Sequence, residues 1–340
     1  MKKILKILVC SLAVLSVAVV FGISAFFSLT KPVSKAENKE TVRFVVPSGM
    51  TTRKAAEKLK QQGLIRSANV FYTCCRLNLF KSEKNFSLKS GVYTLDNSMS
   101  AKEIYQVLNS GRQEYISVSI PEGLTKSQIG SILEENGICS KEDYVLACSD
   151  SSLLKEYSIN AENFEGYLFP DTYYFAPMMQ AKDVIRKQVD TFFQRVQTIP
   201  AVKNLSPEKL HEILILASIV EKEYQVPDEA PLIASVFTNR LNHSIGLYSC
   251  ATIIYIITEI QGLPNPGRVT YDHIAIDSPY NTYKWAGLTP GPISNPGMIA
   301  LKAAANPPKT NYYYFVLTDS EHGRHTFSTN FESHKAAEKK

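Results

Sequence analysis

At residues 214–223 the chain reads Leu214-Ile215-Leu216-Ala217-Ser218-Ile219-Val220-Glu221-Lys222-Glu223. This stretch predicts an apolar helix that carries two carboxylates at its C-terminal end. Glu221 follows Leu214 by seven residues and Ser218 by three, so it lies on a helical stripe of small and apolar side chains. Glu223 lies about 200° away around the helix axis, on the stripe of Leu216. We therefore expect the two carboxylates to face different pockets.

A carboxyl group at this helix end has a physical reason to stay protonated. Burial disfavours its charged form, and the negative end of the helix does the same, so both raise the pKa of a glutamic acid. A glutamic acid with a raised pKa can donate a proton near neutral pH. The alternative is a core helix that ends in a solvated Glu-Lys-Glu, and this segment alone leaves both interpretations open.

The composition is that of a globular chain with room for two domains. The chain has 340 residues, of which 44% are hydrophobic and 20% charged, which excludes a disordered protein. Its net charge of +5 is spread along the sequence. That distribution suits an anionic surface such as a membrane or a cell-wall polymer, and it is not the footprint of a nucleic-acid-binding protein. We therefore expect no nucleic-acid partner.

The N-terminus has the pattern of a membrane anchor. Lys2, Lys3 and Lys6 precede an uncharged and mostly apolar run at residues 7–29. At about 1.5 Å per residue, a helix of this length crosses a bilayer core of about 30 Å. The run is longer than a signal-peptide core and no cleavage site follows it, so we expect an uncleaved single span. The lysines place residues 1–6 in the cytoplasm, and everything beyond a linker at residues 30–41 lies outside it.

An internal repeat follows the linker. Its two copies begin with Val46-Pro47-Ser48-Gly49-Met50-Thr51 and Ile120-Pro121-Glu122-Gly123-Leu124-Thr125. In each copy a strand ends at Pro-x-Gly, and a threonine caps an amphipathic helix that stops at a glycine. Residues 42–158 resemble a LysM-like α+β module, which binds N-acetylglucosamine polymers or only holds the next domain off the membrane. Cys74 and Cys148 occupy equivalent repeat positions, which favours packing roles for both.

Residues 159–340 are predicted to form a separate α+β domain, which makes the fold class α+β. Helices are expected at residues 180–196, at residues 212–223 and from residue 228 to residue 241. Strands are expected at residues 312–317 and 325–328, paired across a turn. The stretches at residues 277–283 and 287–297 are too rich in proline and glycine for regular structure. Their aromatic, amide and hydroxyl groups suit a carbohydrate cleft.

Most catalytic chemistries find no support in the sequence. No histidine pair has the spacing of metal ligands, and His322 and His325 near a turn are expected to have a structural or substrate-contact role. There is no serine-nucleophile elbow, thiol-enzyme signature, disulfide framework, phosphate loop or dinucleotide fingerprint, so we expect neither a metal nor a cofactor. Carboxylate chemistry on a glycosidic bond remains.

A lytic transglycosylase needs only one carboxyl group. A glutamic acid protonates the departing sugar oxygen. The same residue, now a carboxylate, deprotonates the 6-hydroxyl of muramic acid, and that oxygen closes a 1,6-anhydro ring. A lone buried glutamate on an apolar helix is sufficient for this reaction.

Long matches in a fixed order make the chain similar to the endolytic murein transglycosylases of the YceG-like (MltG) family. The matching segments are residues 165–173 (Glu-Gly-Tyr-Leu-Phe-Pro-Asp-Thr-Tyr), 216–223, 236–241, 278–283, 287–293, 295–297, 312–316 and 325–328. The resemblance implies a single-span enzyme whose catalytic domain lies outside the cytoplasm. Such an enzyme cleaves nascent peptidoglycan strands internally, between N-acetylmuramic acid and N-acetylglucosamine, and so ends their elongation.

The resemblance also implies site residues and partners. The catalytic glutamate of the family maps to Glu221. Candidate substrate contacts are Glu165, Tyr167, Asp171, Glu223, Asn239, Ser249, Thr252, Tyr280, Asn281 and Tyr283. The implied partners are peptidoglycan strands, the cytoplasmic membrane and peptidoglycan synthases, among them penicillin-binding proteins.

The chain departs from the family at one point. The family reads Leu-Gln-Ser-Asp-Pro-Thr where this chain reads Leu247-Tyr248-Ser249-Cys250-Ala251-Thr252. The lost acid leaves a second hypothesis open, a catalytically weak paralogue that binds peptidoglycan or serves as a scaffold for wall synthesis. A third hypothesis is a hydrolytic muramidase, in which water replaces the 6-hydroxyl, and residue types do not separate it from a lyase.

Overall fold

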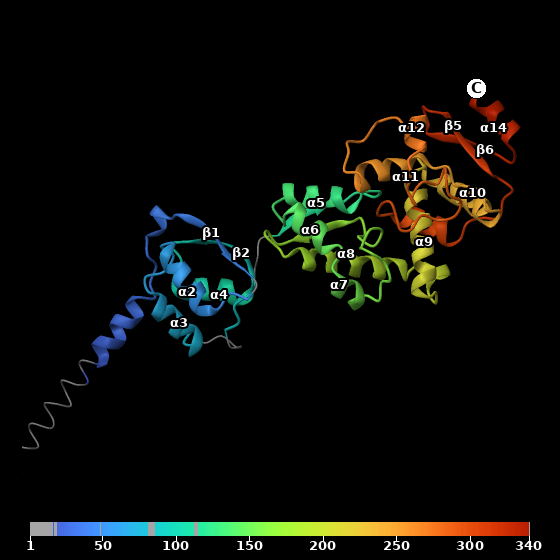
Figure 1. Ribbon diagram of the computed structural model, residues 1–340. Helices are drawn as coiled ribbons and strands as arrows, with labels where there is room; N and C mark the ends of the chain where they lie inside the picture. Colours follow the sequence, from blue (N-terminus) through green and yellow to red (C-terminus); the bar gives the residue numbers. More distant parts are fainter. Residues whose placement is uncertain (1–15, 17–18, 48, 81–85, 112–114, 340) are drawn as a thin grey trace, which may run out of the picture. The chain divides into compact units, whose positions relative to one another are not determined.

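The computed structural model describes residues 16, 19–47, 49–80, 86–111 and 115–339 (Figure 1). The chain is a mixed α+β protein. Its described residues form two compact units, each with its own core. The first ends at Tyr115 and also takes in residues 176–178, and the second consists of Ile116–Phe175 and the chain from Met179 onward.

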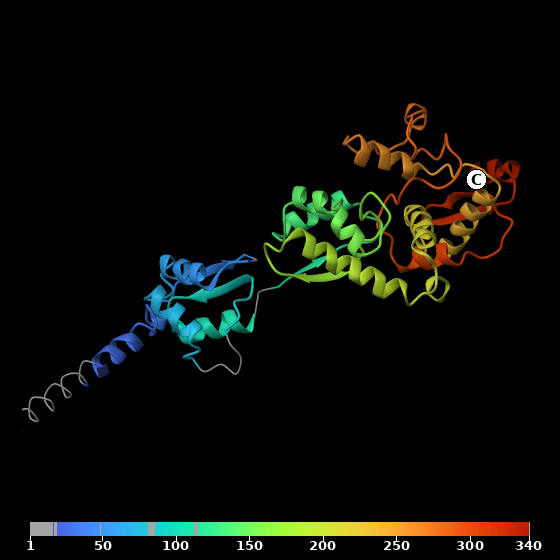
Figure 2. The same cartoon turned by 60° about the horizontal axis from the view of Figure 1, so that its bottom comes forward.

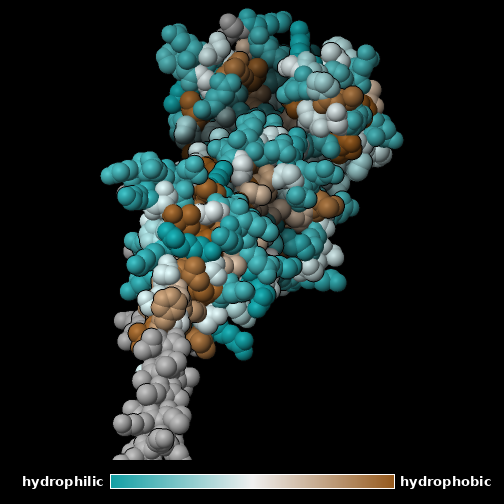
Figure 3. Space-filling model, turned by 90° about the vertical axis from the view of Figure 1, so that its left-hand side faces the viewer, coloured by the Kyte–Doolittle hydropathy of each residue, from teal (hydrophilic) through white to brown (hydrophobic). Residues whose placement is uncertain are grey.

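About half of the predicted membrane span lies outside the described residues, which include residue 16 and residues 19–29 of it. Within the part that is described, residues 19–28 are helical, and several of their apolar side chains are exposed, including Val20, Phe21 and Phe27. On the face drawn in Figure 3, hydrophobic side chains gather where the described chain emerges from the grey atoms. No helix of the described ranges is both long enough and apolar enough to cross a membrane.

The first unit is built around a two-stranded antiparallel sheet. β1 (Thr41–Val46) pairs with β2 (Gly91–Asp96), and Thr41 lies opposite Asp96. Between the strands come α2 (Thr52–Gln61) and α3 (Ala68–Arg76), and after them α4 (Ala101–Ser110). The helices bury their apolar faces with the inner face of the sheet in a core that includes Phe44, Leu59 and Ile104.

The predicted linker is fixed to this first unit. A short 3-10 helix, η1 (Ala36–Asn38), lies within it. Ahead of η1, the amide of Ala101 donates a hydrogen bond of 2.9 Å to the carbonyl of Thr30. Arg66 donates two hydrogen bonds, of 2.7 and 2.9 Å, to the carbonyl of Pro32. Residues 30–34 are therefore held against the unit.

The second copy of the repeat belongs to the second unit. It comprises β3 (Ile116–Ser119), α5 (Lys126–Glu135), α6 (Lys141–Ala147) and α7 (Ser151–Glu156), and β3 pairs antiparallel with β4 (Thr172–Phe175). The sequence predicted a domain boundary at residues 158/159, whereas the units divide at 115/116. The reason is that the buried side chains of α5 and α6 share one core with α8 (Ala181–Val196) and α9 (Pro207–Val220). Both ribbon views show the green repeat helices beside α8 (Figure 1 and Figure 2).

The remainder of the second unit surrounds α9. After η2 (Pro200–Val202) and α9 come η3 (Pro227–Glu229), α10 (Ala230–Asn242), α11 (Cys250–Tyr255), the π-helical turn η4 (Ile256–Ile260) and α12 (Tyr271–Ile274). They are followed by α13 (Met298–Ala305), β5 (Tyr314–Asp319), β6 (Arg324–Ser328) and α14 (Phe331–Glu338). α9 packs against α10 and α13. The predicted β5–β6 pair is confirmed, and residues 277–283 and 287–297 contain neither helix nor strand, as expected.

Helix α9 is longer at its start than predicted. It begins at Pro207 instead of residue 212, because the side chain of Ser206 accepts a hydrogen bond of 3.3 Å from the amide of Lys209 and proline occupies the first helical position. It ends at Val220, and Glu221 is its C-terminal cap. The acid therefore stands at the end of the helix.

Candidate active site

The end of α9 is fixed by the loop that precedes α13. Every residue from Leu214 to Val220 is buried. The hydroxyl of Ser218 accepts a hydrogen bond of 3.0 Å from the amide of Ile293, and its carbonyl accepts one of 3.0 Å from the hydroxyl of Ser294. These bonds set the loop at residues 293–297 beside the last turn of α9.

The carboxyl group of Glu221 lies half-buried between two hydrogen-bond donors. The amide of Gly297 donates to its Oε2 at 2.9 Å, and the hydroxyl of Tyr224 donates to its Oε1 at 3.1 Å. Gly297 is the N-terminal cap of α13, so the carboxyl also faces the positive end of a helix. The arrangement can hold a carboxylate without any metal or cation in contact with it.

The same surroundings keep the proton affinity of Glu221 high. Burial raises the pKa of Glu221 above its ordinary value, and the negative charge of Glu122 adds to that rise. The hydrogen bonds from Gly297 and Tyr224 and the charge of Lys222 act in the opposite direction. Glu221 is thus a carboxyl group with a raised pKa, and its carboxylate form already has two hydrogen-bond donors in place.

The turn of the second repeat packs directly on this carboxyl group. A Cβ atom on Gly123, whose φ is +73°, would lie 3.4 Å from Cγ of Glu221. The ammonium group of Lys222 donates to the carbonyl of Gly123 at 3.1 Å. The amide of Gly123 donates to the carbonyl of Asn295 at 2.8 Å. Residues far apart in the sequence therefore form one wall of the site.

Four of the residues around Glu221 were not selected from the sequence. They are Glu122, Gly123, Tyr224 and Gly297. One signal was present, since the two repeat turns differ in having Ser48 or Glu122 between proline and glycine. No pattern in the sequence indicated that the second turn meets the end of α9.

Glu223 has partners of its own, as its position around the helix predicts. The hydroxyl of Ser249 donates to its Oε1 at 2.5 Å. Thr282 joins the group, because its hydroxyl accepts from the amide of Ser249 at 3.1 Å and lies 2.9 Å from the hydroxyl of Thr252. Burial raises the pKa of Glu223, and the Ser249 hydrogen bond opposes the rise. The structure brings three of the predicted residues together here, away from the donors of Glu221.

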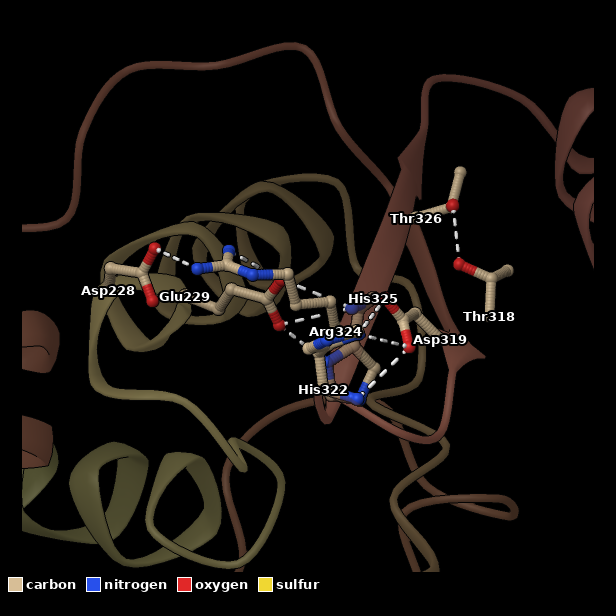
Figure 4. Close-up of polar contacts among 8 residues, drawn as sticks. All are labelled: Asp228, Glu229, Thr318, Asp319, His322, Arg324, His325 and Thr326. Carbon is tan, nitrogen blue, oxygen red and sulfur yellow. Dashed lines mark hydrogen bonds and ion pairs between the residues drawn. The ribbon is translucent and has the colours of Figure 1, made fainter.

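A polar cluster ties the β5–β6 hairpin to the start of α10 (Figure 4). Nδ1 of His325 lies 2.7 Å from Oε2 of the buried Glu229. Arg324 forms an ion pair of 3.1 Å with Asp228, and Nδ1 of His322 lies 2.9 Å from Oδ2 of Asp319. Each of the two histidines therefore has a carboxylate as its neighbour. Across the described ranges, no three His, Cys, Asp or Glu side chains are grouped so as to hold a metal ion.

Glu165 lies inside the second unit, with 2% of its surface exposed. Its Oε1 accepts from the amide of Lys126, the first residue of α5, at 2.9 Å and from the side-chain amide of Asn295 at 2.8 Å. Burial raises the pKa of Glu165 to about 7, against the pull of the Lys126 ammonium group 3.5 Å away. The contacts of Glu165 hold the second repeat and the 293–297 loop together.

Three other candidates hold backbone in place through their polar side chains. Asp171 accepts a hydrogen bond of 2.7 Å from the backbone amide of Thr172 and forms an ion pair of 2.9 Å with Arg195. The side-chain amide of Asn239 donates to the carbonyls of Thr310 and Tyr312, each at 2.9 Å. The amide of Asn281 donates to the carbonyls of Ile274 and Ile276 at 2.9 and 2.7 Å. In the described chain none of the three contacts the carboxyl group of Glu221.

The candidate tyrosines lie in separate places. The hydroxyl of Tyr167 is 2.8 Å from Nδ1 of His211, and both line a cavity of about 420 Å³ with Tyr157 and Phe193. Tyr280 packs against the ring of Tyr255, with 5.2 Å between ring centroids. Tyr283 lies beside Cys250, with 3.1 Å between its hydroxyl and the thiol. Glu221 is not among the residues that line this cavity.

Two of the three residues that depart from the family, Tyr248 and Cys250, lie beside Tyr283. The thiol of Cys250 lies 3.1 Å from the hydroxyl of Tyr283. Tyr248 has a φ of +51°, which is uncommon for a residue with a side chain, and its ring lies 5.6 Å from the guanidinium of Arg240. Both residues are exposed. Neither is among the hydrogen-bond partners of Glu221.

Sequence comparison connects this geometry with a known family. The sequence model of the YceG-like family matches residues 44–340. An endolytic murein transglycosylase of Bacillus subtilis (strain 168) is 32% identical over 329 residues, which cover 92% of this chain and 88% of that protein. An endolytic murein transglycosylase of Streptococcus pneumoniae (strain D39) is 29% identical over 360 residues. This chain is covered to 95% in that match but spans only 62% of the streptococcal protein.

A solved structure shares the fold. The 2.6 Å crystal structure of a YceG-like protein from Listeria monocytogenes superposes with a TM-score of 0.56 at 29% sequence identity. The match covers 88% of this chain and 99% of the listerial one.

Proposed function

The chain belongs to the YceG-like family, and from that premise we propose that it is an endolytic transglycosylase that acts on murein. It cleaves the bond between N-acetylmuramic acid and N-acetylglucosamine inside glycan strands and leaves 1,6-anhydro ends. Cleavage of a nascent strand ends its elongation. The single observation that supports this chemistry best is the half-buried carboxyl of Glu221 between an amide and a phenol.

Glu221 acts first as the acid and then as the base. Its proton passes to the glycosidic oxygen as the bond from C1 of muramic acid to that oxygen breaks. The amide of Gly297 and the hydroxyl of Tyr224 then stabilise the carboxylate that remains. This carboxylate removes the proton of the muramic acid 6-hydroxyl, whose oxygen bonds to C1, and the enzyme regains its starting protonation. No cofactor takes part in these steps.

The test is mass spectrometry of purified, uncrosslinked glycan strands after incubation with the full-length chain. Internal fragments that end in 1,6-anhydro-N-acetylmuramic acid are expected from the wild type and not from Glu221→Gln. Glu223→Gln is the neighbouring control, and it should retain cleavage, because Glu223 contacts Ser249 instead of the proposed donors. Anhydro ends at the wild-type rate from Glu221→Gln would refute the assignment. Fragments with reducing ends would point to a hydrolytic muramidase.

The scaffold hypothesis rests on Cys250 and has its own test. The thiol faces Tyr283 and does not touch Glu221 or its two donors. If the natural site is competent, Cys250→Asp changes kcat/KM by less than about threefold, which corresponds to about 0.6 kcal/mol. A gain of more than tenfold would support a decayed site in the natural chain.

We propose that the enzyme works at the outer face of the cytoplasmic membrane. Residues 7–29 would anchor it there, with residues 1–6 in the cytoplasm, and the LysM-like region would contact the glycan. Residues 30–34 hydrogen-bond to the first unit, so that unit would stand close to the anchor. Peptidoglycan synthases, penicillin-binding proteins among them, are the expected partners because they supply the nascent strand.

A further inference from the structure

A second carboxylate stands beside Glu221, and it comes from the repeat turn. A Cβ atom on Gly297 would lie 2.5 Å from Cγ of Glu122 and 3.3 Å from its Oε1. The amide of the same glycine donates to Oε2 of Glu221 at 2.9 Å. Glu122 and Glu221 therefore contact Gly297 from two different elements. Only a glycine leaves room for Glu122 here, since any side chain would collide with it.

The turn that carries Glu122 is held in place on both sides of this residue. The amide of Ile120 donates to the carbonyl of Asp171 at 3.0 Å, and the amide of Gly123 donates to the carbonyl of Asn295 at 2.8 Å. Lys222 binds the carbonyl of Gly123 at 3.1 Å. These bonds fix the backbone on which the Glu122 side chain stands.

The charge of Glu122 is not neutralised by an ion pair. Its side chain is exposed to solvent. Among the described lysine, arginine and histidine residues, none lies within ion-pair distance of it. Its field therefore acts on the carboxyl group next to it.

We propose that Glu122 is the second functional carboxylate of this site, a positioning residue that acts on the reaction through Glu221. This inference rests on the proposed role of Glu221 as acid and base. Like charges at short range disfavour each other, so an anionic Glu122 favours the protonated form of Glu221. That form is the one that must be present when a glycan strand arrives.

The groups that face Glu221 have opposing effects. Glu122 and burial favour its acid form, whereas Gly297, Tyr224 and Lys222 favour its carboxylate. Lys222 and Tyr224 come from the turn after α9, and Gly297 comes from the start of α13. The repeat turn supplies the negative charge.

The experiment measures kcat/KM of the full-length chain against pH, with defined glycan strands, for the wild type and Glu122→Gln. The alkaline limb of this profile reports the ionisation of the acid in the free enzyme. Loss of the neighbouring charge should move that limb down by about half to one pH unit. Salt screens an exposed charge, so raising ionic strength from about 0.01 to 1 M should move the wild-type limb in the same direction and leave the variant limb nearly still.

Three further variants make the test specific. Glu122→Asp keeps the charge and should keep most of the wild-type profile. Glu122→Ser, which places the residue of the first repeat turn at this position, should behave as Glu122→Gln does. Glu135→Gln removes an exposed carboxylate at the other end of α5 and should change nothing. Thermal melts should show all four variants folded.

The outcomes separate the two proposals. Activity in Glu221→Gln would remove the proposed function and this inference with it. An inactive Glu221→Gln beside a Glu122→Gln with the wild-type profile at both ionic strengths would overturn this inference alone. A folded Glu122→Gln that is inactive at every pH would also overturn it, because a role through Glu221 predicts a shifted profile and not its loss.

Discussion

The two copies of the repeat follow the same local rules and end in different surroundings. In each copy the first helix is capped by threonine, with Thr51 accepting from Lys54 and Thr125 from Gln128 at 3.3 Å. Both helices stop at a glycine in the left-handed region. The first copy lies in the first unit, and the second contributes its buried side chains to the core of the second unit.

The glycines of the two turns show the difference most directly. Gly49 and Gly123 have φ values of +78° and +73°, so both need the freedom that only glycine has. No described atom lies within 4 Å of a Cβ built on Gly49, whereas one on Gly123 would meet Glu221 and Lys222. The same turn is a solvent-facing corner in one unit and a wall of the candidate active site in the other.

Local sequence therefore specifies the conformation of the turn, whereas long-range packing determines which residues the turn contacts and so its role. The residue between proline and glycine is an example, because it is a serine at position 48 and a glutamate at position 122. The second turn lies beside Glu221, where a carboxylate has a function that a serine does not have. Matched substitutions in the two turns can therefore test the comparison, because each pair differs only in its surroundings.

The largest effect is expected from valine at the two turn glycines. Gly123→Val should lower kcat/KM about 100-fold, because its side chain would displace Glu221 and a misplacement of about 1 Å costs that much. Gly49→Val suffers the same backbone strain, of order 1–2 kcal/mol, but should leave kcat/KM unchanged. Steady-state kinetics and thermal melts of both variants measure the two effects separately. Equal losses of activity would show that strain alone, and not contact with Glu221, explains the result.

The next largest effect is expected at Asn295, whose side chain joins the second repeat to its neighbours in the second unit. Its side chain donates to the carbonyl of Leu124 and to Glu165, and accepts from the amide of Leu168, all between 2.8 and 2.9 Å. Asn295→Ala leaves these buried groups without partners, so it should destabilise the second unit by about 2–4 kcal/mol. Hydrogen exchange should show lower protection in residues 116–175 and unchanged protection in residues 41–80.

Asn97→Ala in the first unit is the control for this loss. Its side chain accepts a single hydrogen bond of 3.0 Å, from the amide of Glu40 near the surface, so the expected cost is about 1 kcal/mol or less. A comparable loss from both variants would mean that the second repeat has no special dependence on Asn295.

Glu165 should make the stability of the second unit depend on pH. Burial raises its pKa from an ordinary 4.5 to about 7, so between these values the folded state keeps a proton that the unfolded state releases. The contribution of Glu165 to stability is therefore fully present below pH 4.5, falls as pH rises through this window and is lost above about 7, a change of about 3 kcal/mol in total. In Glu165→Gln this contribution to the slope should vanish. Denaturant titrations from pH 4 to pH 8 measure it.

The first unit contains a carboxyl group whose pKa is shifted in the opposite direction. At the start of α4 the carboxylate of Glu103 accepts hydrogen bonds from the amide and the hydroxyl of Ser100, and these lower the pKa of Glu103. Its contribution is present at neutral pH and is lost as pH falls below the usual glutamate range. If Glu165→Gln kept the wild-type slope between pH 5 and pH 7, Glu165 would not be the buried acid responsible.

The sequence predicted those features that depend on local order. Helix α8, the capped helices of both repeats and the β5–β6 pair lie within a few residues of the predicted bounds, because periodicity and capping residues specify them. The start of α9 was placed late, although Ser206-Pro207 was a legible start signal. The different partners of Glu221 and Glu223 follow from their angular separation on one helix.

The features that depend on long-range packing were not predictable. Glu165 was expected to contact substrate because it stands in a motif, yet it is buried against Lys126 and Asn295, residues 39 and 130 positions away. Nothing local to Glu122 or Gly297 indicates that they meet. The assignment of the second repeat to a separate module failed to anticipate its shared core for the same reason, since its periodicity matches the first copy whatever it packs against.

The smallest effects are expected from the paired cysteines, where the two copies should behave alike. Cys74 and Cys148 are both fully buried, and burial raises the pKa of each thiol. Alanine at either position should cost about 1–2 kcal/mol by loss of packing and leave kcat/KM unchanged. Alkylation of the native chain should be slow at both sites and fastest at the exposed Cys250, as mass spectrometry of the labelled peptides can show. A loss of activity in Cys148→Ala alone would mean that the packing of the second copy affects the position of Glu221. The two copies would then differ in the effect of their cores and not only in the contacts of their turns.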